Sequence, residues 1–536
     1  MNSAGMQVLF ESGSGAIGSD SQHTEIFAFY VIYGEYRMNL NKTRIVVACA
    51  AAFAAQGAFA ACPATFDATA PQAWVNDCAP EAKLAIAGAS SVKDAVSAVV
   101  AADLFDTTTM PVISVKDTST TYANNAANTL AWYGMSKASL TGGVSKRLFV
   151  VYNSNNGSAA GVSAVLATKL DKKLATATLT TGVVGSLEGK ETTVVTVGTA
   201  AGACAAATSS TTIAPVVNCT STAVTPPDVA FSDVHPTEAY KLYTSIAKAK
   251  LADLTSTALV MQGFGVVVNN NLYQALQTKN LAEGLLPSTC TVGDTTGACQ
   301  PSIRRAEYSS IVTKAGGITS AAKLLGTATT DVLTVARRDD LSGTQAVSNI
   351  FFANNACGSN KDAKGKVVAG QLAGLQEIRG AVDSTASLVI VENVASSGVA
   401  TLPTTGYALG VLSLNSTPGG TTRFVKLDGV SPNYTAAGVS DSVRRARLIN
   451  GDYQFQMAFY AVRPTVAMDN TINGKVATKN NMAYPAVVPA LLAGMADSSQ
   501  HNLKGIGYLD TNGSDAAKVS KVSRPLNANC APLMFN

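Results

Sequence analysis

The sequence predicts an α/β protein, because three features alternate along the chain. Apolar, β-prone runs end in short polar turns, and helix-compatible stretches follow the turns. Leu84 to Ala87, Leu148 to Tyr152 and Asp331 to Ala336 are such runs, and each precedes a turn with serine or threonine hydroxyls. Ligands of α/β proteins bind outside the carboxyl ends of the strands. We therefore expect the functional site in these turns.

The composition is that of a folded, exported protein. The 536 residues suffice for two or three domains, and 47% of them are hydrophobic while only 14% are charged. The net charge of +4 comes from scattered lysines and arginines, so no nucleic-acid partner is expected. After residue 60, no apolar run reaches the roughly 18 residues that a transmembrane helix needs, so the protein is expected not to be membrane-spanning.

Residues 38–60 have the three parts of a secretory signal peptide. Met38 to Arg44 is a short basic segment, Ile45 to Phe59 is apolar and alanine-rich, and Ala58-Phe59-Ala60 is an A-x-A cleavage sequence. The protein is therefore predicted to be secreted, with a periplasmic or extracellular location. We interpret residues 1–37 as a mis-called leader, with Met38 as the true start.

The cysteines agree with export to an oxidising compartment. Of the nine cysteines, Cys49 lies in the predicted signal peptide, and the other eight can form four disulfides. Three sequential pairs would close short loops, although spacing alone proves no pairing. The expected disulfides are Cys62–Cys78, Cys204–Cys219, Cys290–Cys299 and Cys357–Cys530.

The turn after the third apolar run has the features of an oxyanion site. Ser342-Gly343-Thr344 stands where a helix N-cap and first turn would lie, and the backbone N–H groups there have no partner within the helix. Arg338 would bring a planar, permanently charged guanidinium to the same point. The alternative for Arg338 is a surface ion pair with Asp339 or Asp340, and Asp340 is expected to orient Arg338.

Three other turns carry side chains that could meet at this site. Ser90 and Ser91 follow the first apolar run, Ser158 follows the second, and Asp233 ends a short strand. The serines could equally be simple helix caps, and Asp233 could be the N-cap of the helix that contains Glu238.

Catalysis has little support in the sequence. After the signal peptide only His235 and His501 remain, which leaves little material for a histidine-based triad or a multi-histidine metal centre. No nucleophile elbow, Walker A loop, zinc-protease motif or EF-hand loop is present. We therefore expect no enzyme activity, no catalytic residue, no metal and no cofactor. His235 is interpreted as a turn residue before Pro236.

Four stretches occur in a recognisable order. They are the turn Gly88-Ala-Ser-Ser91, the turn Gly157-Ser158, the stretch Asp228 to Asp233, and the loop Arg338-Asp-Asp-Leu-Ser-Gly-Thr344. Together they resemble the phosphate-binding protein of bacterial phosphate importers, a type II periplasmic binding protein, over most of residues 80–462. The resemblance implies an anion-binding set of Ala89, Ser90, Ser91, Ser158, Asp233, Arg338, Ser342, Gly343 and Thr344.

The resemblance also implies a two-lobe fold, in which each lobe is a mixed sheet flanked by helices. The lobes would be joined by crossings near residues 266–270 and 455–463, and helices are expected at 303–325 and 485–495. The expected boundaries are 61–266 and 464–536 for lobe one with a β-rich insertion at 173–227, 267–454 for lobe two, and 455–463 for the return crossing.

By this resemblance the protein would be a substrate-binding protein for ABC transport, with an importer permease as a further candidate partner. It would capture inorganic phosphate or a related protonated oxyanion by hinge closure of its lobes. Asp233 would discriminate, because an ionised carboxylate can only accept hydrogen bonds and would repel fully deprotonated sulfate. The insertion, the extra cysteines and Val92, where the family tends to have an aromatic residue, depart from the family. They leave open an envelope or extracellular structural or adhesion protein and, more distantly, a phosphate-ester hydrolase.

Overall fold

The computed structural model describes the chain in segments that belong to the unit Phe59–Asn536. The predicted leader and signal peptide lie outside the described residues. The described residues are 62–63, 65–78, 80–117, 129–154, 157–167, 192–194, 204–207, 215–219, 223–225, 227–242, 251–252, 254–313, 316–338, 342–355, 357, 374–381, 406–416, 418, 421–432, 441–464, 471–472, 475–476, 484–497, 505–509, 518–524 and 529–535.

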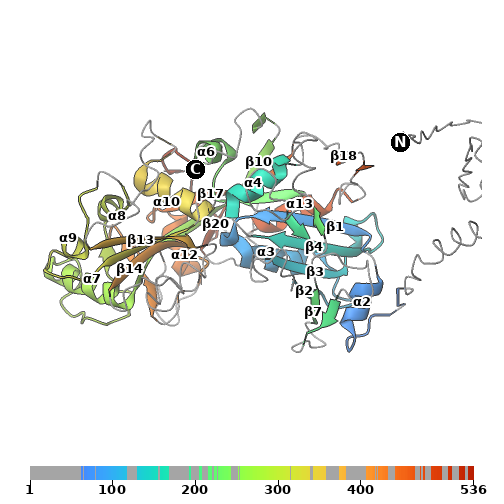
Figure 1. The fold of residues 1–536 in the computed structure, drawn as a ribbon, viewed down its shortest axis with the longest axis horizontal. Coiled ribbons are helices and arrows are strands. Elements are labelled where there is room, and N and C mark those ends of the chain that lie inside the picture. Colours follow the sequence, from blue (N-terminus) through green and yellow to red (C-terminus); the bar gives the residue numbers. More distant parts are fainter. Residues whose placement is uncertain are drawn as a thin grey trace, which may run out of the picture. The chain divides into compact units, whose positions relative to one another are not determined.

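These segments contain the following helices and strands, labelled as in Figure 1. The strands are β1 (Ala82–Gly88), β2 (Ile113–Asp117), β3 (Thr129–Met135), β4 (Arg147–Asn153), β5 (Thr192–Val194), β6 (Cys204–Ala206), β7 (Val216–Cys219), β8 (Ala223–Thr225), β9 (Val229–Ser232), β10 (Leu254–Asn269), β11 (Ser302–Ile303), β12 (Leu333–Arg338), β13 (Leu375–Ala381), β14 (Tyr407–Ser413), β15 (Thr422–Phe424), β16 (Lys426–Leu427), β17 (Gln456–Pro464), β18 (Thr471–Ile472), β19 (Lys475–Val476), β20 (Ile506–Tyr508), β21 (Val522–Ser523) and β22 (Met534–Phe535). The helices, with η for short 3-10 or π segments, are α2 (Pro71–Asp77), η1 (Ser90–Val92), α3 (Lys93–Val99), η2 (Val100–Leu104), η3 (Ala138–Leu140), α4 (Gly157–Ala167), α6 (Pro236–Leu242), α7 (Asn270–Ala282), α8 (Arg305–Val312), α9 (Ala321–Leu325), α10 (Gly343–Ala353), α12 (Asp441–Ile449) and α13 (Val487–Ala496).

The main sheet is mixed, and the predicted α/β class is confirmed. Its strands follow the order β13-β12-β14-β10-β17-β9-β1-β4-β3-β2-β7-β6, and β15 and β20 also pair with β10. β1 is parallel to β4 and β9, and β12 is parallel to β13 and β14, whereas β10 and β17 are antiparallel. The carboxyl ends of β1, β4 and β9 therefore meet at one edge.

β10 joins two parts of this sheet. Its residues from Leu254 to Gly263 pair with β17, and those from Phe264 to Val268 pair with β14. The strand is buried from Leu259 onward, as expected for an apolar strand with partners on both sides. The expected crossings near 266–270 and 455–463 overlap the end of β10 and β17. The division into two lobes and its boundaries stay a prediction.

Both faces of β1 and β4 are covered, which explains why their sequences are apolar without alternation. Leu84 and Val150 pack in one hydrophobic cluster, together with residues of α3 and α13. Ala85 and Phe149 pack in another cluster on the opposite face, together with α2 and β7. A third cluster surrounds β10, β12 and β14. Figure 1 shows α7, α8 and α9 beside β13 and β14.

The helical prediction for residues 303–325 is correct for two parts of this range and wrong for the residues between them. The structure has α8 and α9 with a break between them, and α9 starts again at Ser320, whose hydroxyl accepts a hydrogen bond from the backbone N–H of Lys323. The sequence Gly316-Gly317 lies in the break, and glycine disfavours a helix interior because its unfolded backbone has more freedom to lose. The helix expected at 485–495 is present as α13.

Four disulfides lie among the described residues, with the four pairings that the sequence suggested. Cys62–Cys78 and Cys204–Cys219 lie in the first part of the chain, and Cys290–Cys299 closes a loop after α7. Cys357–Cys530 ties the region after α10 to the C-terminal segment. Of the predicted insertion, the structure describes β5 to β8, with β6 and β7 paired through Cys204 and Cys219.

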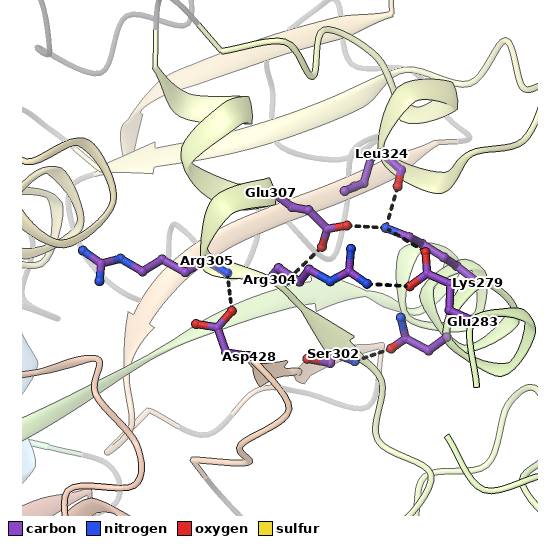
Figure 2. A network of polar contacts seen from close by, with 9 residues as sticks. Lys279, Glu283, Ser302, Arg304, Arg305, Glu307, Leu324 and Asp428 are labelled. Carbon is purple, nitrogen blue, oxygen red and sulfur yellow. Dashed lines mark hydrogen bonds and ion pairs between the residues drawn. The ribbon is translucent and has the colours of Figure 1, made fainter. Parts of the chain in front are cut away.

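A polar network ties together α7, α8 and α9 (Figure 2). The Lys279 ammonium of α7 contacts the Glu307 carboxylate of α8 and donates to the Leu324 carbonyl of α9 at 2.9 Å. From α8, the Arg305 guanidinium donates to the Phe351 carbonyl on the last turn of α10, with Nη2 at 2.7 Å. Arg305 therefore holds the C-terminal end of α10, and thus helps to orient its N-terminus.

Candidate anion-binding site

Strand ends bring most of the predicted site residues together. In the register of the sheet, Gly88 of β1 is opposite Phe231 of β9, and Ala87 is opposite Asn153 of β4. Ser91 follows β1 in η1, Ser158 follows β4 in the first turn of α4, and Asp233 directly follows β9. The second set of predicted residues comes from the end of β12 and the start of α10, and it packs directly against the first.

Close backbone packing at the end of β1 sets the position of the 89–91 turn. Gly88 has φ +123°, and a Cβ there would collide with the Phe231 backbone. On α4, a Cβ at Gly161 would lie 2.5 Å from the Gly88 Cα atom. Glycine is required at both positions because only its bare backbone allows strand, turn and helix to approach this closely.

Asp233 is the centre of the cluster. Its carboxylate is 2% exposed and accepts a hydrogen bond from the Ser91 hydroxyl at 2.5 Å and from the Ser158 hydroxyl at 3.3 Å. The Asp233 backbone N–H donates to Ser158 Oγ at 3.1 Å. The serines and Asp233 were also candidates for helix caps. In the structure the Ser91 and Ser158 hydroxyls bond to Asp233, and none of these contacts caps α6.

Arg338 reaches the same cluster from the end of β12. Its side chain is 3% exposed, and Nη2 donates to the Ser90 hydroxyl at 3.1 Å. The backbone N–H of Arg338 donates to Gln345 Oε1 at 3.2 Å, which holds the strand end against the first turn of α10. Arg338 is thus a buried cation at the cluster, and its alternative as a surface residue is wrong. Asp339 and Asp340 lie outside the described residues.

The N-terminus of α10 completes the arrangement. Ser342 is the N-cap, and its hydroxyl accepts a hydrogen bond from the Gln345 N–H at 3.3 Å. Gly343 lies so close to the first set that a Cβ would collide with Ser158 Oγ and Asp233 Oδ2. Thr344 is buried in the first turn. The partial positive charge of the 11-residue helix therefore faces the Asp233 carboxylate.

Ala89 is a predicted site residue whose main-chain groups contact the sheet. Its N–H donates to the Phe231 carbonyl at 2.9 Å, and its carbonyl accepts from the Tyr152 hydroxyl. Both groups therefore fasten the turn to the sheet in this structure. Its proposed contact with an anion stays a prediction.

Burial raises the pKa of the Asp233 carboxyl to about 6, although the hydrogen bond from Ser91, the charge of Arg338 and the hydrogen bond from Ser158 each lower it. Desolvation disfavours the charged form, and it outweighs the three stabilising contacts. The carboxyl is therefore mostly ionised at neutral pH and protonated in mild acid.

This raised pKa predicts a pH-dependent difference in stability between the wild type and Asp233→Asn. The folded state binds the Asp233 proton more tightly than the unfolded chain, so its stabilising contribution is complete below the ordinary pKa of 3.8 and is lost as the pH rises to about 6. The free energy of unfolding of the wild type, relative to the variant, should fall by about 3 kcal/mol over this window. Denaturant titrations at several pH values measure the difference, and a constant difference would contradict the assignment.

His235, two residues from Asp233, faces a different set of partners. Its Nδ1 lies 2.8 Å from the Thr237 hydroxyl and accepts from the Thr237 N–H at 3.2 Å, so the imidazole caps the start of α6. Burial lowers the pKa of His235 to about 4, which keeps it neutral beside Glu238. His235 therefore supports the turn, as the sequence suggested.

Three functional candidates were not identified from the sequence. Gln345 joins Arg338 to Ser342, as described above. Gln262 in β10 is 1% exposed, and its Nε2 donates to the Ser91 carbonyl at 3.3 Å. Asn415, just after β14, donates to the same carbonyl. No motif marks an isolated amide as part of a site, so only the fold could reveal Gln262 and Asn415.

In the described segments, no group of three or more histidine, cysteine, aspartate or glutamate residues could hold a metal ion. Within the same segments, none of the helices combines the length and apolar character needed to cross a membrane.

Comparison with known proteins gives similarity to solved structures alone. No protein-family model and no curated protein matches the chain. A protein from Clostridium perfringens, described as a putative phosphate ABC transporter substrate-binding protein with bound phosphate, is 11% identical; the match covers 79% of this chain and 99% of that one, with a TM-score of 0.36. An ABC-type phosphate transport receptor from Vibrio cholerae is 14% identical, with coverage of 76% and 93% and a TM-score of 0.32. PstS from Borrelia burgdorferi is 9% identical, with coverage of 78% and 94% and a TM-score of 0.30.

Proposed function

We propose that the protein binds phosphate or a similar protonated oxyanion, in the manner of a secreted solute-binding protein. The observation that supports this most is the buried Asp233 carboxylate, which lies in one cluster with the Arg338 guanidinium and the N-terminus of α10. A guanidinium and helix N–H groups favour an anion. A carboxylate in the same place favours an anion that can donate a hydrogen bond.

Three donors of the cluster make contacts that an oxyanion could replace. Arg338 Nη2 is bonded to the Ser90 hydroxyl, and the hydroxyls of Ser91 and Ser158 are bonded to Asp233. An entering anion would take the hydrogen bonds of Arg338 and of the α10 N-terminus. Ser91, Ser158 and Asp233 come before β10 in the chain, and Arg338 and α10 come after it. Opening and closing of the site would therefore be a hinge motion about the strands that connect these two sets.

The carboxylate would determine which anion is bound. With a pKa of about 6, Asp233 is mostly ionised at pH 7.5, and it then only accepts hydrogen bonds. Monohydrogen phosphate and arsenate each carry a proton that can be donated to it, whereas sulfate at this pH carries none. Sulfate would place an acceptor against an acceptor in a buried site, which costs affinity.

Isothermal titration of the purified chain at pH 7.5 tests this function. Phosphate and arsenate are expected to bind with a Kd well below about 1 mM, and sulfate about 100-fold more weakly. Asp233→Asn should narrow the difference between phosphate and sulfate, because an amide can donate to sulfate through its N–H groups. Phosphate binding no better than millimolar, or equal binding of the three anions by the wild type, would contradict the proposal.

The same preparation separates the alternatives. Absence of oxyanion binding together with association of the protein with cell surfaces or filaments would favour an envelope or adhesion protein. Turnover of a chromogenic phosphate ester would favour a hydrolase. If the protein serves transport with a permease as its partner, a cell from which the protein is removed should lose phosphate uptake.

A further inference from the structure

Two side-chain amides outside the anion-binding set meet at the main chain of Ser91. We infer that Gln262 and Asn415 are positioning residues of the oxyanion site, because they hold the Ser91 carbonyl and thereby direct the Ser91 hydroxyl to Asp233. This inference rests on the proposed function of the site, and it names residues that would act through Ser91 rather than touch the anion.

Gln262 contacts Ser91 at two points. Its Nε2 donates to the Ser91 carbonyl at 3.3 Å, and its Oε1 lies 3.4 Å from the Ser91 hydroxyl. Glutamine is suited to this pair because its side chain both donates and accepts. Glutamate in its place would put an acceptor against the Ser91 carbonyl, and methionine would keep the length while losing both contacts. Since Gln262 is 1% exposed, water could not readily replace them.

Asn415 approaches the same carbonyl from the turn after β14. Its Nδ2 donates to the Ser91 carbonyl, while its Oδ1 accepts from the Ser413 hydroxyl, which is fully buried. Ser413 therefore fixes which end of the amide faces Ser91. A carbonyl oxygen has two lone pairs, so it can accept from both Gln262 and Asn415.

The position of Ser91 determines how its single hydroxyl proton is used. Two acceptors lie near the hydroxyl: Asp233 Oδ1 at 2.5 Å and Gln262 Oε1 at 3.4 Å. With the main chain held, the shorter contact is the bond to Asp233. Loss of either amide would free the turn to rotate and weaken that bond. The Asp233 carboxylate would then lose a partner that it needs to stay ionised in a buried place.

A double-mutant cycle with Ser91→Ala tests the inference. Gln262→Met and Asn415→Ala are each expected to weaken phosphate binding about tenfold, because each removes a hydrogen bond to the Ser91 carbonyl. Gln262→Glu should weaken it more strongly, because it places an acceptor against that carbonyl. In the Ser91→Ala background the first two changes should have little further effect, since the hydroxyl that they position is gone. Asn271→Ala is the matched control: its Nδ2 donates to the Gly406 carbonyl at 3.3 Å, away from Ser91.

A second measurement needs no ligand. NMR titration of the Asp233 side-chain carboxyl should show its midpoint moving to higher pH in Ser91→Ala, Gln262→Met and Asn415→Ala, and staying in place in Asn271→Ala. If the wild type does not bind phosphate but these midpoints move, the proposed function fails and the positioning role stands. If the wild type binds phosphate while the amide variants bind equally well and the midpoints stay unchanged, the positioning role is overturned. The positioning role is also overturned if Gln262→Met and Asn415→Ala weaken phosphate binding as much in the Ser91→Ala background as in the wild type.

Discussion

Replacing Arg338 with methionine is expected to lower the affinity for phosphate at least 100-fold. The guanidinium can give an oxyanion two parallel charge-assisted hydrogen bonds, and each contributes about 1.5–3 kcal/mol. Its charge also lowers the pKa of Asp233, so its loss leaves that carboxyl protonated to a higher pH. Arg338→Lys keeps the charge without the planar fork, and it should fall between the wild type and Arg338→Met. Titration calorimetry at pH 7.5 measures all three.

Arg304→Met is a suitable comparison for this change. Its side chain is 55% exposed, and its guanidinium pairs with Glu283 in the network of Figure 2, away from the cluster. The expected affinity of this variant is that of the wild type. Circular dichroism and thermal unfolding should show that Arg338→Met remains folded. Wild-type affinity in a folded Arg338→Met protein would remove this residue from the site.

Replacing Gly343 with alanine is expected to weaken phosphate binding about tenfold to 100-fold. A Cβ at this position would collide with Ser158 Oγ and Asp233 Oδ2 and would lie 2.8 Å from Ser158 Cβ. Relieving such a collision in a packed interior costs about 1–3 kcal/mol, and here it would push the first turn of α10 away from the carboxylate. Alanine is the better helix former by about 1 kcal/mol, so a weaker helix cannot be the reason for the loss.

Gly317→Ala provides the control for Gly343→Ala. Gly317 lies between α8 and α9, and a Cβ there would meet no atom within 4 Å. This variant should bind phosphate like the wild type. Binding by Gly343→Ala that matches Gly317→Ala would mean that the contact between α10 and Asp233 has no part in holding an anion.

Local sequence patterns indicated the strands, the turns and the three cysteine pairs that close short loops. The apolar runs of β1 and β4 have no polar alternation because neighbouring elements cover both faces of these strands, and such runs are visible without a structure. The break between α8 and α9 was missed because the helical pattern resumes after it. Gly316-Gly317 was the available signal, and it interrupts the helix through backbone freedom rather than through polarity.

The sequence by itself determined the kinds of groups that could form an anion site: hydroxyls and a carboxylate in turns after strands, one arginine, and a helix N-terminus at Gly343. The tertiary structure alone decided which of them meet. Ser91 and Asp233 are 142 positions apart, and their hydrogen bond depends on the register of β1 and β9. Gln262 and Asn415 carry no sequence signal, because an amide acquires its role from the carbonyl that packing places beside it.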